Sequence, residues 1–440
     1  MSPRLLHLGL RENAAQFSLL VAVNAFVGAM VGLERSTLPL IGRQDFGLHS
    51  STAVLSFIVA FGVAKALTNL AAGALAERAG RRRLLIAGWA VALPVPLLIA
   101  VAPSWGWIVA ANAVLGINQG LTWSMTVVMK IDLVGPRRRG LALGLNESAG
   151  YGGVALAAGL GGWLAASFAA RAVLVGAGAL IAVTGFLLSV LFVRDTADHV
   201  ALEQANHHPG ADGVAPPLRR AFAQATYSDP ALRSCSQAGL VNNLNDALAW
   251  GLVPLFLAAH GASIGDVALI AALYPGVWSV AQIATGHWSD RVGRKPLIAG
   301  GMLIQAAALG LLALSGGALA AASVAAVLLG AGTALVYPTL IAAVSDAVTP
   351  VARAPVVGVY RFWRDSGYVF GGLVAGGVAD ALGYGGAIGL VAGLTAASGL
   401  WVLHDMPSPH PAMVSPPEDG GTPGLEASEV RPGHHGEPAA

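Results

Sequence analysis

The stretch GALAERAGRRR, residues 73–83, places one acidic residue and four arginines between long apolar segments. The stretch GHWSDRVGRKP, residues 286–296, repeats this pattern 213 residues later. Each has a glycine, an acidic residue followed by arginine, and a second glycine followed by arginine: Gly73, Glu77, Arg78, Gly80 and Arg81, then Gly286, Asp290, Arg291, Gly293 and Arg294. A weak internal repeat of this kind indicates a chain of two related halves.

The segments around the charged stretches have the composition of a membrane protein. Hydrophobic residues make up 55% of the chain, charged residues make up 11%, and the mean hydropathy is +0.67. A helix needs about 20 predominantly apolar residues to cross a bilayer. We therefore predict an all-α membrane protein with twelve spans, at 14–41, 50–75, 84–103, 105–130, 140–166, 171–193, 233–259, 264–288, 297–315, 318–345, 354–381 and 384–404.

The distribution of basic residues predicts the topology. Of the 25 lysines and arginines, 18 lie in the N-terminus, the even-numbered loops and the tail, and only Arg43 and Arg171 lie in odd-numbered loops. Cytoplasmic loops carry an excess of these residues, so both termini are predicted to be cytoplasmic. Because topology already accounts for the basic residues, we expect the lipid bilayer and no nucleic acid as a partner.

A second pair of stretches supports the duplication. DLVGPRRRGLALG, residues 132–144, aligns with DAVTPVARAPVVG, residues 346–358, so that Asp132, Pro136, Arg139 and Gly144 fall on Asp346, Pro350, Arg353 and Gly358. We predict two six-helix bundles related by a pseudo-two-fold axis, with the substrate path between them. The boundaries are 1–193 for the N-terminal bundle, 194–232 for a cytoplasmic linker, 233–404 for the C-terminal bundle and 405–440 for a disordered cytoplasmic tail.

The repeated stretch resembles the signature loop of the major facilitator superfamily, G-x-x-x-[DE]-R-x-G-R-[KR]-[KR], and the resemblance covers residues 14 to 404. It implies the twelve-helix fold of this superfamily, in the plasma (inner) membrane, and a transporter rather than an enzyme, with no cofactor. It also implies that the two loops form a cytoplasmic gate that stabilises an outward-open state. The alternative is that their arginines only anchor the topology. We expect a monomer.

Ionisable side chains inside the predicted spans are the candidate substrate and coupling residues, because such groups are rare in hydrocarbon and usually functional. In the run 354–381, Arg361, Arg364, Asp365 and Tyr368 share about one third of a helix circumference. Arg361 precedes Asp365 by four residues and can pair with it, which leaves Arg364 to bind an anion or a partner acid. The alternative is a self-neutralised structural cluster.

The run 233–259 carries Asn242, Asn245 and Asp246 on one arc. Burial disfavours the charged form of a carboxylate, so Asp246 is the first choice for carrying a coupling proton, with Glu147 and Glu34 behind it. The alternative is polar packing between helices.

The remaining buried charges indicate the substrate class. Lys65 lies at about the depth of Asp365 and can contact either Asp365 or Glu147, whereas Lys130 is expected to extend to the membrane interface and is left out. Four basic and four acidic groups remain: Arg35, Lys65, Arg361, Arg364, Glu34, Glu147, Asp246 and Asp365. This balance predicts an anionic or zwitterionic small molecule rather than a lipophilic cation.

The functional prediction is a secondary active transporter that works by alternating access, with the proton as coupling ion and no metal site. Gly116 stands where proton-coupled members of the superfamily often carry arginine, and AAGLGG, residues 157–162, keeps only part of the drug-antiporter pattern G-P-x-x-G-G. The alternatives are a non-transporting membrane sensor on the same fold and a multidrug or lipophile exporter.

Overall fold

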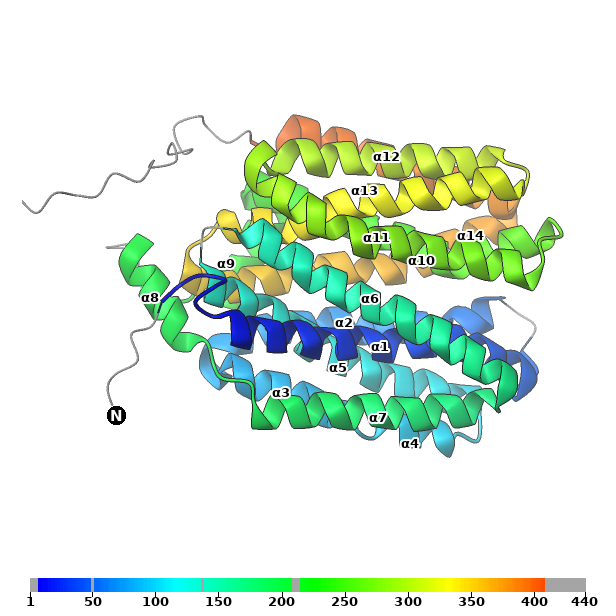
Figure 1. The fold of residues 1–440 in the computed structure, drawn as a ribbon. Coiled ribbons are helices and arrows are strands. Elements are labelled where there is room, and N and C mark those ends of the chain that lie inside the picture. Colours follow the sequence, from blue (N-terminus) through cyan, green and yellow to red (C-terminus); the bar gives the residue numbers. More distant parts are fainter. Residues whose placement is uncertain (1–6, 49–50, 136–137, 208–213, 408–440) are drawn as a thin grey trace, which may run out of the picture. The chain divides into compact units, whose positions relative to one another are not determined.

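This computed structural model describes residues 7–48, 51–135, 138–207 and 214–407 (Figure 1). The secondary structure of these residues consists of helices, without strands. In chain order the elements are α1 (Ala14–Gln44), α2 (Ser51–Ala79), α3 (Arg81–Ala92), α4 (Val95–Ala100), α5 (Trp105–Val134), α6 (Arg139–Ser167), α7 (Ala170–Leu191), α8 (Ala197–His207), α9 (Leu218–Ala223), the π-helix η1 (Gln224–Ser228), α10 (Pro230–Ala259), α11 (Ile264–Val292), α12 (Arg294–Leu314), α13 (Leu319–Asp346) and α14 (Pro350–Asp405).

The helices follow the predicted runs closely, with two local differences. The run 84–103 is divided into α3 and α4 around Pro94, which lacks the N–H that would continue the helix. The last two runs are joined in α14, which is interrupted only at Gly383, where φ is 75° and ψ is 171°. Pro136 and residues 408–440 of the predicted tail lie outside the described residues.

The second glycine of each charged stretch forms a turn between two helices. Gly80 separates α2 from α3 with φ at 84°, and Gly293 separates α11 from α12 with φ at 93°. These positive φ values are readily adopted by glycine and disfavoured for other residues. The repeated sequence therefore produces the same sharp helix–turn–helix corner twice.

Eight helical segments of the described chain are long and apolar enough, by length and composition, to cross a membrane. They lie in α1, α2, α3 with α4, α7, α11, α12, α13 and α14. The other long helices, α5, α6 and α10, carry many buried polar side chains, among them Gln119, Asn146, Glu147 and Asp246. Their polar groups face the interior of the protein, which places the candidate site between helices.

The segment predicted as linker is itself partly helical. It contains α8, α9 and η1, and α8 lies at one end of the long helices, which we call the linker end (Figure 1). Helices distant in sequence pack side by side, notably α2 with α14 and α6 with α11. These two pairings join the first half of the chain to the second.

Candidate functional site

Glycines bring helices from the two halves of the chain into backbone contact at the linker end. A β-carbon on Gly73 of α2 would lie 2.7 Å from the Cα of Gly358 in α14. A β-carbon on Gly286 of α11 would lie 3.0 Å from the Cα of Gly144 in α6. The repeat relates these two pairs to each other. Helices approach this closely only where small residues meet.

Next to the first glycine contact, Arg81 joins two acidic residues. Its Nη2 lies 2.6 Å from Glu77 Oε1, and its Nε donates to Asp132 Oδ2 at 2.7 Å. Arg81 and Asp132 are buried. Arg78 and Arg291, the other arginines of the two motifs, are exposed. The buried arginine of the first motif therefore makes the ion pairs, and the exposed one is left at the surface.

The second motif repeats this arrangement and adds a helix N-terminus. Arg294 lies 2.9 Å from Asp290 and 3.0 Å from Asp346. Asp290 also accepts hydrogen bonds from the backbone N–H groups of Gly140, at 3.0 Å, and Leu141, at 3.1 Å, in the first turn of α6. The positive end of a helix dipole favours such a carboxylate. A side chain of the second half thus caps a helix of the first.

One linker residue connects the two sets of ion pairs. Arg353 contacts Asp132 at 3.3 Å and Glu203 of α8 at 2.8 Å, while Arg139 contacts Asp346 at 3.1 Å and also Glu203. The second repeated stretch pointed to both arginines and both aspartates, but nothing in the sequence pointed to Glu203. We call the alternating series of charges the linker-end network: Glu77, Arg81, Asp132, Arg353, Glu203, Arg139, Asp346, Arg294 and Asp290.

Deeper in the protein, Asp365 contacts four buried polar or charged side chains. It lies 2.7 Å from Arg364 and 3.8 Å from Lys65, and it accepts from Asn69 at 2.5 Å and Asn243 at 3.0 Å. All five residues are buried. The Lys65–Asp365 contact is the first of the two that the sequence allowed.

The expected pair between Arg361 and Asp365 is not formed. Arg361 is fully buried, and none of its guanidinium nitrogens has a hydrogen-bond partner among the described residues. Helical spacing sets where two Cα atoms lie, but it does not set the direction of a long side chain. Arg364, whose guanidinium lies 5.0 Å from the ring centre of Tyr337, reaches the carboxylate instead.

Asp246 is surrounded by phenols rather than by the amides of its own helix. The hydroxyl of Tyr274 in α11 donates to Asp246, and the hydroxyl of Tyr368 lies 3.5 Å from its other oxygen. Tyr274 also lies 3.4 Å from the Thr333 hydroxyl. Tyr274 was not predicted, because a tyrosine in an apolar run carries no signal until its neighbours are known.

The amides predicted to flank Asp246 bind elsewhere. Asn242 accepts from Gln305 of α12 at 3.0 Å, and Asn245 donates to the same glutamine at 2.9 Å. Thr395 donates to Asn245 at 2.8 Å. These two asparagines therefore join α10 to α12 and α14, which agrees with the alternative interpretation of polar packing between helices.

Glu147 belongs to a buried group that includes Lys130. It accepts from the indole of Trp123 at 3.2 Å and from Asn146 at 2.6 Å. Lys130 is fully buried and donates to Asn146. The expectation that Lys130 extends to the membrane interface is therefore wrong, because α6 supplies a polar partner before the side chain reaches the end of its helix.

Glu34 and Arg35, which are adjacent in α1, point to different surroundings. The guanidinium of Arg35 lies 5.2 Å from the ring centre of Phe61, 5.7 Å from that of Phe57 and 5.3 Å from that of Trp250. Glu34 is buried and faces α5. Arg35 therefore rests on aromatic faces, an arrangement that favours a cation through the ring quadrupole.

An aromatic layer lies between the two halves of the chain. Tyr151 of α6 stacks on Trp278 of α11 with ring centres 3.5 Å apart, and its hydroxyl donates to Tyr337 of α13 at 2.8 Å. The ring centre of Trp123 lies 5.3 Å from that of Tyr151. This layer was not predicted, although Tyr151 follows Glu147 by one helical turn and shares its face.

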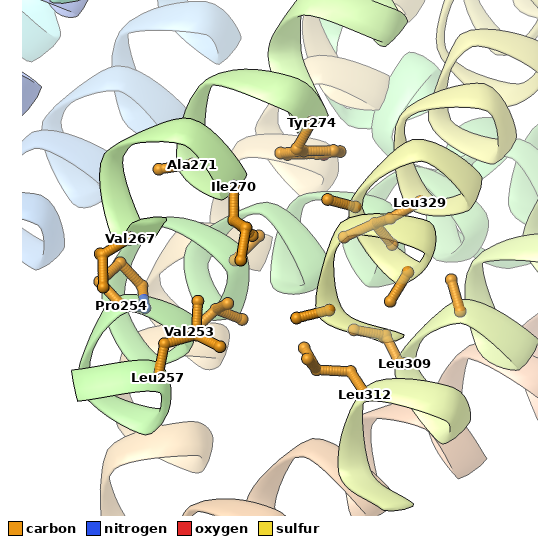
Figure 2. Close-up of a pocket in the computed structure, with 15 residues that line it drawn as sticks. Val253, Pro254, Leu257, Val267, Ile270, Ala271, Tyr274, Leu309, Leu312 and Leu329 are labelled. Atoms are coloured by element: carbon orange, nitrogen blue, oxygen red, sulfur yellow. The ribbon is translucent and has the colours of Figure 1, made fainter. Parts of the chain in front are cut away.

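A separate apolar pocket lies within the second half, between α10, α11, α12 and α13 (Figure 2). Its wall is aliphatic, with side chains such as Val253, Ile270 and Leu309, and Tyr274 borders it on one side. No charged residue lines it. This cavity does not offer a site for an ion.

These features define the class of protein: a multi-pass helical membrane protein whose two repeated sets of helices meet at a closed charged end and a polar, aromatic centre. The family model described as Major Facilitator Superfamily matches residues 15–232 and 236–431. The chain belongs to the Major Facilitator Superfamily, whose members transport small molecules and are not enzymes.

Individual relatives agree with this assignment. The chain is 26% identical to an uncharacterised MFS-type transporter of Salmonella typhimurium, over 85% of this chain and 92% of the relative. It is 27% identical to the 3-(3-hydroxy-phenyl)propionate transporter of Escherichia coli, over 82% of this chain and 88% of the relative. The fold is similar to that of the human organic anion transporter MFSD10, with a TM-score of 0.72 and 17% identity over 89% of this chain and 99% of that one.

The glycine contact at the linker end generates a first prediction. Gly73→Ala introduces a β-carbon 2.7 Å from backbone atoms of α14, so α2 and α14 must separate. Overpacking of this kind destabilises a packed structure by about 1–3 kcal/mol. Here it destabilises only the closed form, in which the two helices meet. A cysteine at the buried Ser345, in a Cys235→Ser background, should therefore react faster with a membrane-impermeant maleimide applied to the linker end.

The matched control is Gly300→Ala in α12, because a β-carbon on Gly300 meets no atom within 4 Å. It should label at the parental rate. Equal labelling of the two alanine variants would show that the glycine contact does not hold this end closed.

Proposed function

We propose that this chain is a secondary active transporter that carries a small organic anion by alternating access, with the proton as coupling ion. Its two moving bodies are residues 1–193 and 233–404, joined by the linker 194–232. The observation that carries the proposal is Arg361, a buried guanidinium without a hydrogen-bond partner among the described residues. Burying an unpaired charge is costly, and a substrate anion would remove that cost.

The other cations of the centre each have a charged, polar or aromatic neighbour, although two guanidinium nitrogens of Arg364 and one of Arg35 lack a hydrogen-bond partner among the described residues. Arg364 and Lys65 lie on Asp365. Arg35 lies on aromatic rings, and Lys130 donates to Asn146. Arg361 therefore takes the anion-binding role first assigned to Arg364, and its planar fork suits a carboxylate bound through two oxygens.

The surroundings of Arg361 favour a carboxylate that carries an aromatic ring. The groups that act on its charge are Arg364, Asp365, Glu147 and Tyr337. Tyr337 belongs to the layer that contains Tyr151 and Trp278. Rings stack and pack edge to face with gains of about 0.5–1.5 kcal/mol beyond area burial. The relative from Escherichia coli, named as a transporter of a hydroxyphenylpropionate, supports the same substrate class.

Asp246 is the proposed proton carrier. Its hydrogen-bond partners among the described residues are the phenols of Tyr274 and Tyr368, and no cation makes an ion pair with it there. Burial without a cationic partner favours the protonated carboxyl. Tyr368 lies in α14, the helix that also carries Arg361, and so connects Asp246 to the helix of the proposed anion site.

We further propose a monomer in the plasma (inner) membrane, with both termini and the linker end on the cytoplasmic side. The excess of basic residues in the loops of this end supports the orientation. The linker-end network then closes the cytoplasmic side, so that this conformation of the protein is not open to the cytoplasm. Motifs matched in both halves favour transport over a sensor role, because a sensor needs no paired gates.

A second candidate, export of an uncharged lipophile, is favoured by the aliphatic cavity bordered by Tyr274. A relative named multidrug resistance protein MdtG, from Serratia proteamaculans, is 25% identical over 60% of this chain and 61% of its own length. The cavity lies within one half of the chain, however, and a substrate moved by alternating access must contact both halves.

The anion site generates a second prediction. Arg361→Gln should weaken binding of 3-phenylpropionate to the purified protein by about 10- to 100-fold, the value of a charge-assisted contact. Arg361→Lys should recover only part of this loss. Binding is measured by isothermal titration calorimetry, and transport by counterflow in proteoliposomes.

Arg171→Gln is the control, because Arg171 forms a more exposed ion pair with Asp45. It should bind 3-phenylpropionate like the parent. Full binding by Arg361→Gln, or a parent protein that carries only lipophilic cations, would contradict the anion assignment.

Coupling generates a third prediction. Asp246→Asn removes the titrating carboxyl and retains its shape, so accumulation of substrate driven by a pH gradient should be lost while counterflow persists. The experiment compares both assays in the same proteoliposomes, with Asp45→Asn as the control carboxylate outside the buried centre. Undiminished pH-driven accumulation by Asp246→Asn would assign the proton to another group.

A further inference from the structure

The linker helix α8 is built into the linker-end network rather than lying free on the surface. Thr196, directly before α8, donates to Asp132 at 2.8 Å, and His199 lies 3.2 Å from the Asn13 side chain. Glu203 is fully buried. A polar linker that only tethers two bundles needs no buried carboxylate, so this placement calls for a role of its own.

Glu203 occupies the one position in the network that neither repeat supplies. Arg139 and Arg353 are equivalent in the repeat, and each has an acid from the opposite half: Asp346 for Arg139 and Asp132 for Arg353. The two arginines are close enough for their charges to act on each other. The linker-end network thus holds two like charges close together, and they repel each other.

Glu203 compensates this repulsion by binding both arginines. Its Oε1 lies 2.8 Å from Arg353 Nη2 and also binds Arg139, and its Oε2 accepts from Arg353 Nη1 at 3.2 Å. Removing one partner from a buried ion network leaves uncompensated charge and is strongly destabilising. The closed linker end therefore depends on a residue that belongs to neither bundle.

We propose that Glu203 is a positioning residue of the transport cycle. Through it, α8 holds the two halves together at the linker end and releases them when it moves away. While Glu203 binds Arg139 and Arg353, the linker end stays closed. Opening requires α8 to withdraw its carboxylate, after which repulsion between the two arginines drives the halves apart. This inference rests on the alternating access proposed above, but not on the identity of the substrate or of the coupling ion.

The test uses the full chain with a cysteine at Ser345 in a Cys235→Ser background, labelled from the linker end with an impermeant maleimide and no substrate. Ser345 is buried, and its carbonyl accepts from Arg139. Glu203→Gln should raise the labelling rate by about tenfold or more, and Glu203→Asp should give a smaller rise. Asp198→Asn, at an exposed acid of the same helix, should leave the rate unchanged.

A second variant distinguishes release of the closed linker end from a general loss of protein stability. In Glu203→Gln with Arg353→Gln, one of the two repelling charges is gone, so labelling should fall back toward the parental rate. A labelling rate of Glu203→Gln equal to that of the parent, or a double variant that labels faster than Glu203→Gln, would overturn the proposal. Because the assay contains no substrate, failure of the anion assignment would leave this result standing.

Discussion

The backbone contact between glycines of different halves is the constraint on which the rest of the structure depends. Gly73 meets Gly358, and Gly286 meets Gly144, at separations that leave no room for a side chain. Because α2 and α11 approach their partners this closely, arginines and acids from both halves come within ion-pair distance. The linker-end network is thus a consequence of the glycine contacts, and its buried charges in turn require the carboxylate of Glu203.

The charged side chains in the centre of the protein are paired less completely than those at the linker end. At the linker end each buried charge has a partner, whereas the centre holds Arg361 without a hydrogen-bond partner among the described residues and Asp246 with phenols alone. A satisfied network stabilises one conformation, and incomplete sites respond to what binds them. The chain therefore separates the groups that hold a state from the groups that sense ligand and proton.

The sequence was sufficient for the features that depend on local pattern. Apolar runs placed the helices, and the repeat indicated that the chain has two related halves. It was insufficient where a side chain chooses among partners from other helices. Lys130 finds Asn146, and Arg364 rather than Arg361 takes Asp365. Helical spacing cannot decide such choices, because they depend on which helices are neighbours. Glu203 was missed for the same reason.

Alternating access itself is tested most directly by the distance between the two halves at the linker end. Arg83, at the start of α3, and Val292, at the end of α11, are exposed and lie outside the linker-end network. Spin labels attached to cysteines at these two positions therefore leave the network intact. Pulsed electron paramagnetic resonance should give a short distance for the closed form and a second, longer distance whose population changes when 3-phenylpropionate or a lower pH is applied. A single distance that is insensitive to both would contradict the account.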